Sequence, residues 1–275
     1  MSTKPVRVVR HPDAVVELRL DDPGRGNALD LPTAEALRDA TAEVAADPGG
    51  AVLLRAAGAT FCVGGDLRAF AGRGEETGAY VHAVATAAHA AVRALYELPV
   101  PVVTAVRGAA AGGGIGLALV GDIVLAAQSA RFRLAYTAMG LTPDCGATWL
   151  LPRLVGPRLA TDLVLTNRVL TGEDAERFGL VTRAVGDDEV DETAYRTAAE
   201  LAGGAGEALR AAKRLLRDQG AGEGLSRHLD EEARLIAGLA GSGEAQARMT
   251  AFLTARVRRR AGSGPSLPNA PQSVS

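Results

Sequence analysis

Three consecutive glycines interrupt the segment AAAGGGIGLAL (residues 109–119), which otherwise has the composition of a buried helix. Glycine inside a helix costs about 1 kcal/mol relative to alanine, so this run suggests that the backbone itself has a chemical role. The first N–H groups of a helix have no partner within the helix, and together with the helix dipole they attract negative charge. Because glycine has no Cβ, a ligand carbonyl can approach such a backbone closely. The run therefore predicts a site for an oxygen atom that gains negative charge.

A second glycine pair, in CVGGDL (residues 62–67), repeats this arrangement, and Asp66 is expected to anchor the start of a helix there. Two such sites could supply the two N–H donors of an oxyanion hole, which stabilises the charge that develops on a carbonyl oxygen in a transition state. A phosphate-binding loop or tight packing of a helix on a strand explains the glycines equally well, because glycine clusters alone are weak signals.

Alternating apolar strands and amphipathic helices must position these glycines, and they indicate an α/β fold. Strands are predicted at 14–20, 51–58, 101–108, 122–128 and 130–136, and helices at 31–48, with Asp30 as N-cap, and at 80–98. From about residue 152 helices dominate, at 173–181, 191–202, 206–218 and 225–239. We expect an α/β core over residues 1–200, a helical region over 201–260 and a disordered tail over 261–275.

Composition excludes several classes of protein. The chain has 30 Lys and Arg against 32 Asp and Glu, so no large basic surface is available for nucleic acid. Cys62 and Cys145 are too few for a zinc site or a disulfide framework and are expected to pack as small apolar groups. The N-terminus lacks the apolar segment of a signal peptide, and no apolar run reaches about 18 residues. We expect a cytoplasmic protein with neither a metal nor a membrane partner.

Several longer segments, in this order, resemble the enoyl-CoA hydratase/isomerase (crotonase) superfamily. They are GRGNALD (24–30), FCVGGDL (61–67), AVRGAAAGGGIGLALVGDIVLAA (105–127), FRLAYTAMGLTPDCGATWLLPRLVG (132–156) and AERFGLVTRAV (175–185). The resemblance implies a spiral of ββα units with a C-terminal helical trimerisation region, in a homotrimer or hexamer. It also implies an acyl-CoA thioester substrate, with no prosthetic group and coenzyme A present only as part of the substrate.

The resemblance also implies where the thioester binds. Its oxygen would lie between the N–H groups of Gly65 and Gly113. Arg25 is interpreted either as a ligand of a CoA phosphate or as a solvated loop residue. The other residues expected to contact coenzyme A are Val63, Gly64, Asp66, Leu67, Gly112 and Phe252.

Acidic side chains decide which reaction follows. The two glutamates of the hydratases fall on Gly116 and Tyr136 here, and a tyrosine with its ordinary pKa near 10 is a poor base at neutral pH. Asp144 matches the single acid/base of the ring-epoxide and enoyl isomerases of phenylacetyl-CoA breakdown, and one carboxylate is enough to move a proton between two carbons. The alternative for Asp144 is a helix cap that accepts a hydrogen bond from the N–H of Ala147.

His89 supports a second enzymatic interpretation, because 4-chlorobenzoyl-CoA dehalogenases carry their catalytic histidine at this position. In that chemistry Asp144 would be the nucleophile and His89 would activate water to cleave the ester, and a thioester hydrolase could use the same pair. Tyr136 stands where those enzymes have a tryptophan. A structural role for His89, which shares a helix face with His82, is the alternative. We predict an acyl-CoA isomerase; a dehalogenase-like enzyme, a hydratase and a non-catalytic acyl-CoA-binding protein are the other candidates.

Overall fold

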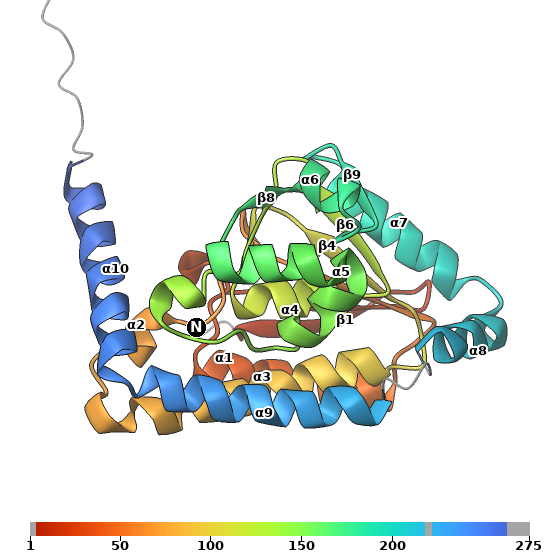
Figure 1. Cartoon of the computed structure of the whole chain (residues 1–275). Helices are drawn as coiled ribbons and strands as arrows, with labels where there is room; N and C mark the ends of the chain where they lie inside the picture. The colour runs from red at the N-terminus through yellow and green to blue at the C-terminus, as the bar shows by residue number, and fades with distance from the viewer. Residues whose placement is uncertain (1–3, 218–221, 263–275) are drawn as a thin grey trace, which may run out of the picture.

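The computed structural model describes residues 4–217 and 222–262, and in these residues the strands form two sheets (Figure 1). The larger sheet has six strands in the order β1-β2-β3-β4-β6-β9; β1 and β2 are antiparallel and every other neighbouring pair is parallel. The strands are β1 (Val6–Arg10), β2 (Val15–Leu20), β3 (Ala51–Ala56), β4 (Val102–Val106), β6 (Ile123–Ala127) and β9 (Arg183–Val185). Four of these, β2, β3, β4 and β6, confirm predicted strands, whereas β1 and β9 were not predicted.

The first strand of the smaller sheet lies directly before the glycine run in the chain. This sheet consists of β5 (Ala109–Ala111), β7 (Arg131–Arg133) and β8 (Leu170–Thr171), and β5 ends where the loop into α4 (Gly113–Leu119) begins. The strand predicted over 130–136 is wrong beyond Arg133, because Ala135 has a φ of 59° and the chain then enters the 3-10 turn η3 (Thr137–Met139). This turn carries Tyr136 at its start.

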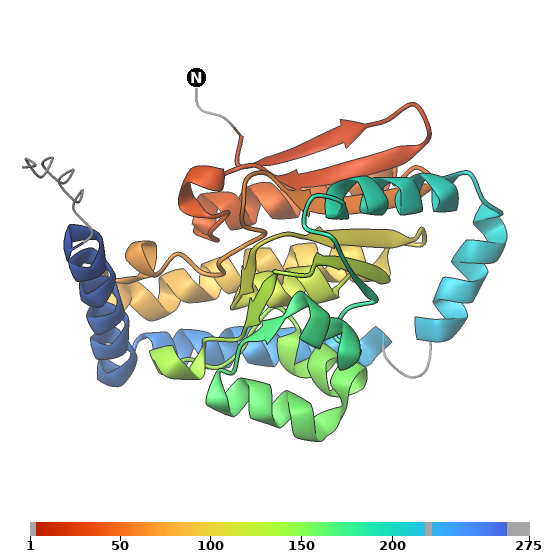
Figure 2. The ribbon, with the colours of Figure 1, turned by 90° about the horizontal axis from the view of Figure 1, so that it is seen from above.

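Helices cover both faces of the larger sheet. Below it in Figure 1 lie α1 (Leu31–Ala46) and α3 (Thr77–Glu97), which pack against each other. The predicted cap of α1 is confirmed, since the Asp30 side chain accepts a hydrogen bond from the N–H of Thr33 at 2.9 Å. Above the sheet, α7 (Val190–Ala202) packs on β3, β4 and β6, and in the view from above it lies in front of the strands (Figure 2).

Four short helical segments and the longer helix α5 lie in the connections between these layers. They are α2 (Leu67–Phe70), α5 (Ala147–Thr166), α6 (Gly172–Arg177) and the 3-10 turns η1 (Pro23–Arg25) and η2 (Gly74–Glu76). The helix α5 is kinked at Gly156, which has a φ of 75° and a ψ of 159° and is followed by Pro157. The predicted cap of α2 is confirmed, because the carboxylate of Asp66 accepts from the N–H groups of Arg68 and Ala69.

Three further helices follow the sheets, as the sequence predicts for this region. They are α8 (Gly206–Arg217), α9 (Gly222–Ala240) and α10 (Gly243–Gly262). The helix α9 packs lengthwise against α3, and α10 follows it at an angle and contacts η3 and α2 (Figure 1). The predicted tail begins too early, because α10 continues through Gly262; its remainder, residues 263–275, lies outside the described residues. No helix in the described part of the chain combines the length and the apolarity needed to cross a membrane.

Candidate active site

The two glycine segments meet at the start of α4. Gly64 has a φ of 82°, and a methyl group placed on it would lie 2.6 Å from the carbonyl oxygen of Ala111 and 3.1 Å from the nitrogen of Gly113. A side chain at this position would therefore overlap the neighbouring backbone, so only glycine allows the two segments to touch. This contact brings the backbone of Gly65 next to that of Gly113.

Two backbone N–H groups are free at this contact. Within residues 4–217 and 222–262, neither the N–H of Gly65 nor that of Gly113 has a hydrogen-bond partner. Gly113 is the first residue of α4, so its N–H is one of the groups that a helix leaves unsatisfied. Gly113 is buried, and a buried N–H without a partner is costly, which indicates that this donor serves a ligand. Gly65 is partly exposed, so a ligand can reach both donors. Together they can bind one oxygen atom that carries negative charge.

Asp144 lies beside this pair of donors. A methyl group placed on Gly113 would lie 3.4 Å from the Oδ1 of Asp144, and the hydroxyl of Tyr136 donates a hydrogen bond to the same oxygen. The side chain does not cap α5: the N–H of Ala147 donates to the backbone carbonyl of Asp144 at 3.0 Å, and Gly146 is the N-cap residue. The capping interpretation of Asp144 is therefore wrong, and its carboxylate is left for another role.

The surroundings make Asp144 a stronger base than an ordinary carboxylate. Burial raises the pKa of Asp144, and the negative charge of Glu232 adds to this effect, while His89 and the hydrogen bond from Tyr136 oppose it. Burial also raises the pKa of Tyr136 well above its ordinary value, so its hydroxyl stays protonated and donates. Asp144 remains partly exposed, so a substrate can reach its carboxylate.

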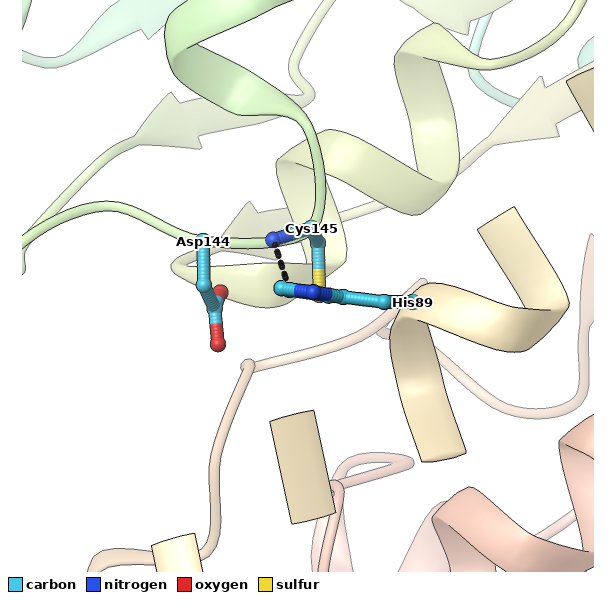
Figure 3. Close-up of side chains that lie close together, drawn as sticks. All are labelled: His89, Asp144 and Cys145. Atoms are coloured by element: carbon cyan, nitrogen blue, oxygen red, sulfur yellow. Dashed lines mark hydrogen bonds between the residues drawn. The ribbon is translucent and has the colours of Figure 1, made fainter. Parts of the chain in front are cut away.

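His89 is a buried residue of α3 that binds the backbone rather than a ligand (Figure 3). Its Nε2 accepts a hydrogen bond from the N–H of Cys145 at 3.0 Å. Since a backbone N–H only donates, this nitrogen carries no proton, and the neutral ring holds its proton on Nδ1. His82 is exposed and does not share the environment of His89. The geometry agrees with the structural role of His89.

The ligand atoms of His89, Asp144 and Cys145 lie within 4.8 Å of one another, a spacing that would suit a metal ion (Figure 3). Burial raises the pKa of the Cys145 thiol, as is usual for a cysteine that packs as a small apolar group. The Nε2 of His89 is already used by a hydrogen bond. We therefore interpret this cluster as the support of a turn.

The turn that carries Asp144 and Cys145 fills the space that the side chain of a hydratase-type glutamate at position 116 would need. A methyl group placed on Gly116 would lie 2.1 Å from the carbonyl oxygen of Cys145 and 2.6 Å from its Cβ. The turn from Asp144 to Gly146 thus packs directly on α4, and a larger residue at position 116 could fit only if this turn moved.

Replacing Gly116 by alanine should lower the free energy of unfolding by about 1–3 kcal/mol, because the added methyl group overpacks a filled interior. The matched control is Gly238→Ala on α9, where a methyl group meets nothing within 4 Å. That change should be neutral or stabilising by up to about 1 kcal/mol, because alanine favours helix. Urea unfolding of the two variants measures the difference, and equal stabilities would contradict the packing that we describe.

One residue of this site, Glu232 on α9, was not predicted. The residue is 4% exposed, and its carboxylate accepts hydrogen bonds from the N–H of Gly146 at 2.8 Å and from the hydroxyl of Thr148 at 2.5 Å. A sequence signal existed: Glu232 lies at a helical spacing between Leu229 and Ile236, in an otherwise apolar stripe. An acid in such a stripe faces the interior and needs buried partners.

The residues predicted to contact coenzyme A lie in two places. Val63 is exposed at the glycine contact, and Asp66 directly follows the pair of glycines, as the N-cap of α2. Arg25 is held by the carboxylates of Asp22, Asp30 and Asp66 at 2.7, 2.5 and 3.2 Å. A phosphate would have to compete with these three ion pairs. Leu67 begins α2 beside this cluster, and Phe252 is exposed on α10, which contacts α2 and η3.

The fold and the site define an α/β enzyme that places two backbone N–H donors beside one carboxylate. The family model described as enoyl-CoA hydratase/isomerase matches residues 10–258, and the chain belongs to this family. A probable enoyl-CoA hydratase of Rhodobacter capsulatus is 39% identical over 207 residues, which cover 75% of this chain and 79% of that protein. The 1,2-epoxyphenylacetyl-CoA isomerase of Escherichia coli is 43% identical over 155 residues, 55% of this chain and 58% of that protein.

Solved structures agree with this assignment. A crystal structure of an enoyl-CoA hydratase/isomerase from Pseudoalteromonas atlantica superposes with a TM-score of 0.80 at 33% identity, over 92% of this chain and 98% of that one. The crotonase fold predicted from the sequence is therefore confirmed, and the protein is an enzyme of a family that acts on acyl-CoA thioesters. The homotrimer or hexamer and the absence of a prosthetic group stay predictions.

Proposed function

We propose that the protein is an acyl-CoA isomerase that moves a double bond, or rearranges an activated ring, in a CoA thioester. One observation carries this proposal: the carboxylate of Asp144 lies beside the free N–H of Gly113, while Gly116 and Tyr136 occupy the positions of the hydratase acids. One base next to an oxyanion site is sufficient for a proton shift between two carbons. The resemblance of this region to the isomerases of phenylacetyl-CoA breakdown supports the same choice.

In the proposed reaction Asp144 removes a proton from a carbon conjugated with the thioester carbonyl. The negative charge moves to the carbonyl oxygen, which the N–H groups of Gly65 and Gly113 stabilise by hydrogen bonds. Asp144 then returns the proton to a different carbon, so that the double bond changes position and no water is consumed. Tyr136 orients the carboxylate through its hydroxyl and leaves Oδ2 free to carry the proton.

The geometry argues against the alternatives that need an activated water. In a dehalogenase-like cycle His89 would act as a base, yet its Nε2 lone pair is already used by the N–H of Cys145. Hydration needs a group that delivers a proton while another activates water, and the backbone of Cys145 fills the space beside Gly116.

Crotonyl-CoA should accordingly be hydrated far more slowly than an ordinary enzymatic substrate. The reason is that Tyr136, whose pKa is raised by burial, cannot accept a proton near neutral pH. Loss of absorbance of the conjugated thioester measures hydration. Turnover of about 10 per second or more would mean that the missing acids had been misinterpreted.

A panel of enoyl-CoA and aromatic CoA thioesters in deuterated water tests the proposed function itself. Isomerisation leaves the molecular formula unchanged but exchanges carbon-bound hydrogen for deuterium, which mass spectrometry of the thioester detects. Hydration, dehalogenation and hydrolysis each change the formula. An enzyme that binds these thioesters and catalyses neither exchange nor any change of formula would instead be the non-catalytic acyl-CoA-binding protein.

A further inference from the structure

The turn that carries Asp144 has an unfavourable backbone conformation. Its two central residues both have positive φ angles, 53° at Cys145 and 76° at Gly146, and the N–H of Ala147 closes it on the carbonyl of Asp144. This is the pattern of a type I′ turn, in which asparagine or glycine is favoured at both central positions. Cysteine in the left-handed region is strained, and such a conformation persists only where its surroundings enforce it.

Two helices from distant parts of the chain provide that enforcement. From α3, Nε2 of His89 accepts the N–H of Cys145; from α9, Oε2 of Glu232 accepts the N–H of Gly146 at 2.8 Å. The other oxygen of Glu232 accepts the hydroxyl of Thr148 at 2.5 Å and its N–H at 3.3 Å. Side chains of α3 and α9 thus hold three residues of the turn and of the start of α5, namely Cys145, Gly146 and Thr148.

Burying the carboxylate of Glu232 to hold the turn is unfavourable in free energy. Burying a carboxylate is unfavourable unless hydrogen bonds replace its water, and an apolar residue would continue the stripe of α9. Besides its bonds to Gly146 and Thr148, the carboxylate has the Nε2 of His228 at 3.3 Å. It also lies at the N-terminus of α5, where the helix dipole favours negative charge. Every partner on α5 belongs to the segment that directly follows Asp144.

We propose that Glu232 is a positioning residue, which holds the turn at Asp144–Gly146 from α9 and so keeps the Asp144 carboxylate beside the N–H of Gly113. This inference rests on the proposed function of Asp144 as the acid/base. It assigns to the C-terminal helical region a direct part in the geometry of the active site. Glu232 does not touch the substrate; it acts through the backbone of the turn.

The variant Glu232→Gln tests this role, and Glu231→Gln is its matched control. Glu231 is the preceding residue, is exposed and pairs with Arg234 on the surface. An amide cannot accept the N–H of Gly146 and both groups of Thr148 together, so the turn should loosen. We expect kcat for isomerisation to fall on the order of 100-fold, as for a displacement of about 1 Å at a reacting group. KM should change by less than about threefold, because the substrate contacts are untouched.

A pH profile separates positioning from mere structural support. The groups that face Asp144 are Tyr136, His89, Cys145 and Glu232. Because the negative charge of Glu232 raises the pKa of Asp144, its removal should move the acid limb of kcat/KM to lower pH. Glu232→Asp keeps the charge and shortens the reach by one methylene, so kcat should fall while the acid limb stays near the wild-type position.

The rate of amide hydrogen exchange in the peptide that spans residues 143–149, followed by mass spectrometry, measures how firmly the turn is held and does not depend on catalysis. Exchange should be faster in Glu232→Gln than in wild type and unchanged in Glu231→Gln.

If wild type isomerises its substrate but Glu232→Gln has the same kcat and the same rate of hydrogen exchange as the control Glu231→Gln, the inference is wrong. If Glu232→Gln raises only KM, it is also wrong. If wild type isomerises no thioester, the proposed function fails, and the exchange rates still decide whether Glu232 holds the turn. If Glu232→Gln does not fold, Glu232→Asp takes its place in both measurements.

Discussion

Replacing Asp144 by asparagine should lower the rate of isomerisation, and of deuterium exchange into the substrate, by about 100- to 10,000-fold. The amide has nearly the same size as the carboxylate, and its oxygen can still accept the hydroxyl of Tyr136, so the site should keep its shape. Only the ability to take a proton near neutral pH is lost. Binding of the thioester, measured by calorimetry, should persist, and retained exchange in the folded variant would show that Asp144 is not the base.

His89→Gln distinguishes a proton shuttle from a nucleophile in the same position. The glutamine oxygen can replace Nε2 as the acceptor for the N–H of Cys145, so the turn should hold and isomerisation should continue at a similar rate. If Asp144 instead attacked the substrate, loss of the base would trap an ester on Asp144. The intact mass of the protein after incubation with substrate detects such an adduct. We expect none, and an added acyl or aryl mass would defeat the isomerase proposal.

Local sequence patterns were sufficient to predict much of the fold and to indicate part of the candidate site. The apolar runs at β3 and β4 are short and bounded by Pro and Gly, and the Asp30 cap precedes a regular helical stripe. The glycines around Gly65 and Gly113 indicated either a backbone binding site or close packing of two segments, because glycine leaves room beside the backbone for both. These features depend on neighbours in the chain, so a single sequence reveals them.

The support of Asp144 depends instead on contacts between distant segments. His89, Cys145 and Glu232 belong to α3, the turn and α9, and nothing in the local sequence pairs them. The residue pair Pro143 and Asp144 resembles a helix cap, yet the left-handed conformation of Cys145 turns the carboxylate away from the helix. This conformation could not be predicted, because cysteine rarely adopts it and only the tertiary contacts enforce it.

Gly113→Pro should lower kcat by about 100- to 1,000-fold, the cost of removing one donor from an oxyanion hole, which is about 3 kcal/mol. Proline is tolerated in the first position of a helix, and Gly113 is that residue of α4, so the fold should survive. The control is Gly113→Ala, which adds the same Cβ, 3.1 Å from the thiol of Cys145, but keeps the N–H. Its smaller loss measures the effect of the Cβ, and the ratio between the two variants reports the loss of the N–H together with the two further ring carbons of proline. A folded proline variant that turns over as fast as the alanine variant would show that the N–H of Gly113 does not bind the thioester oxygen.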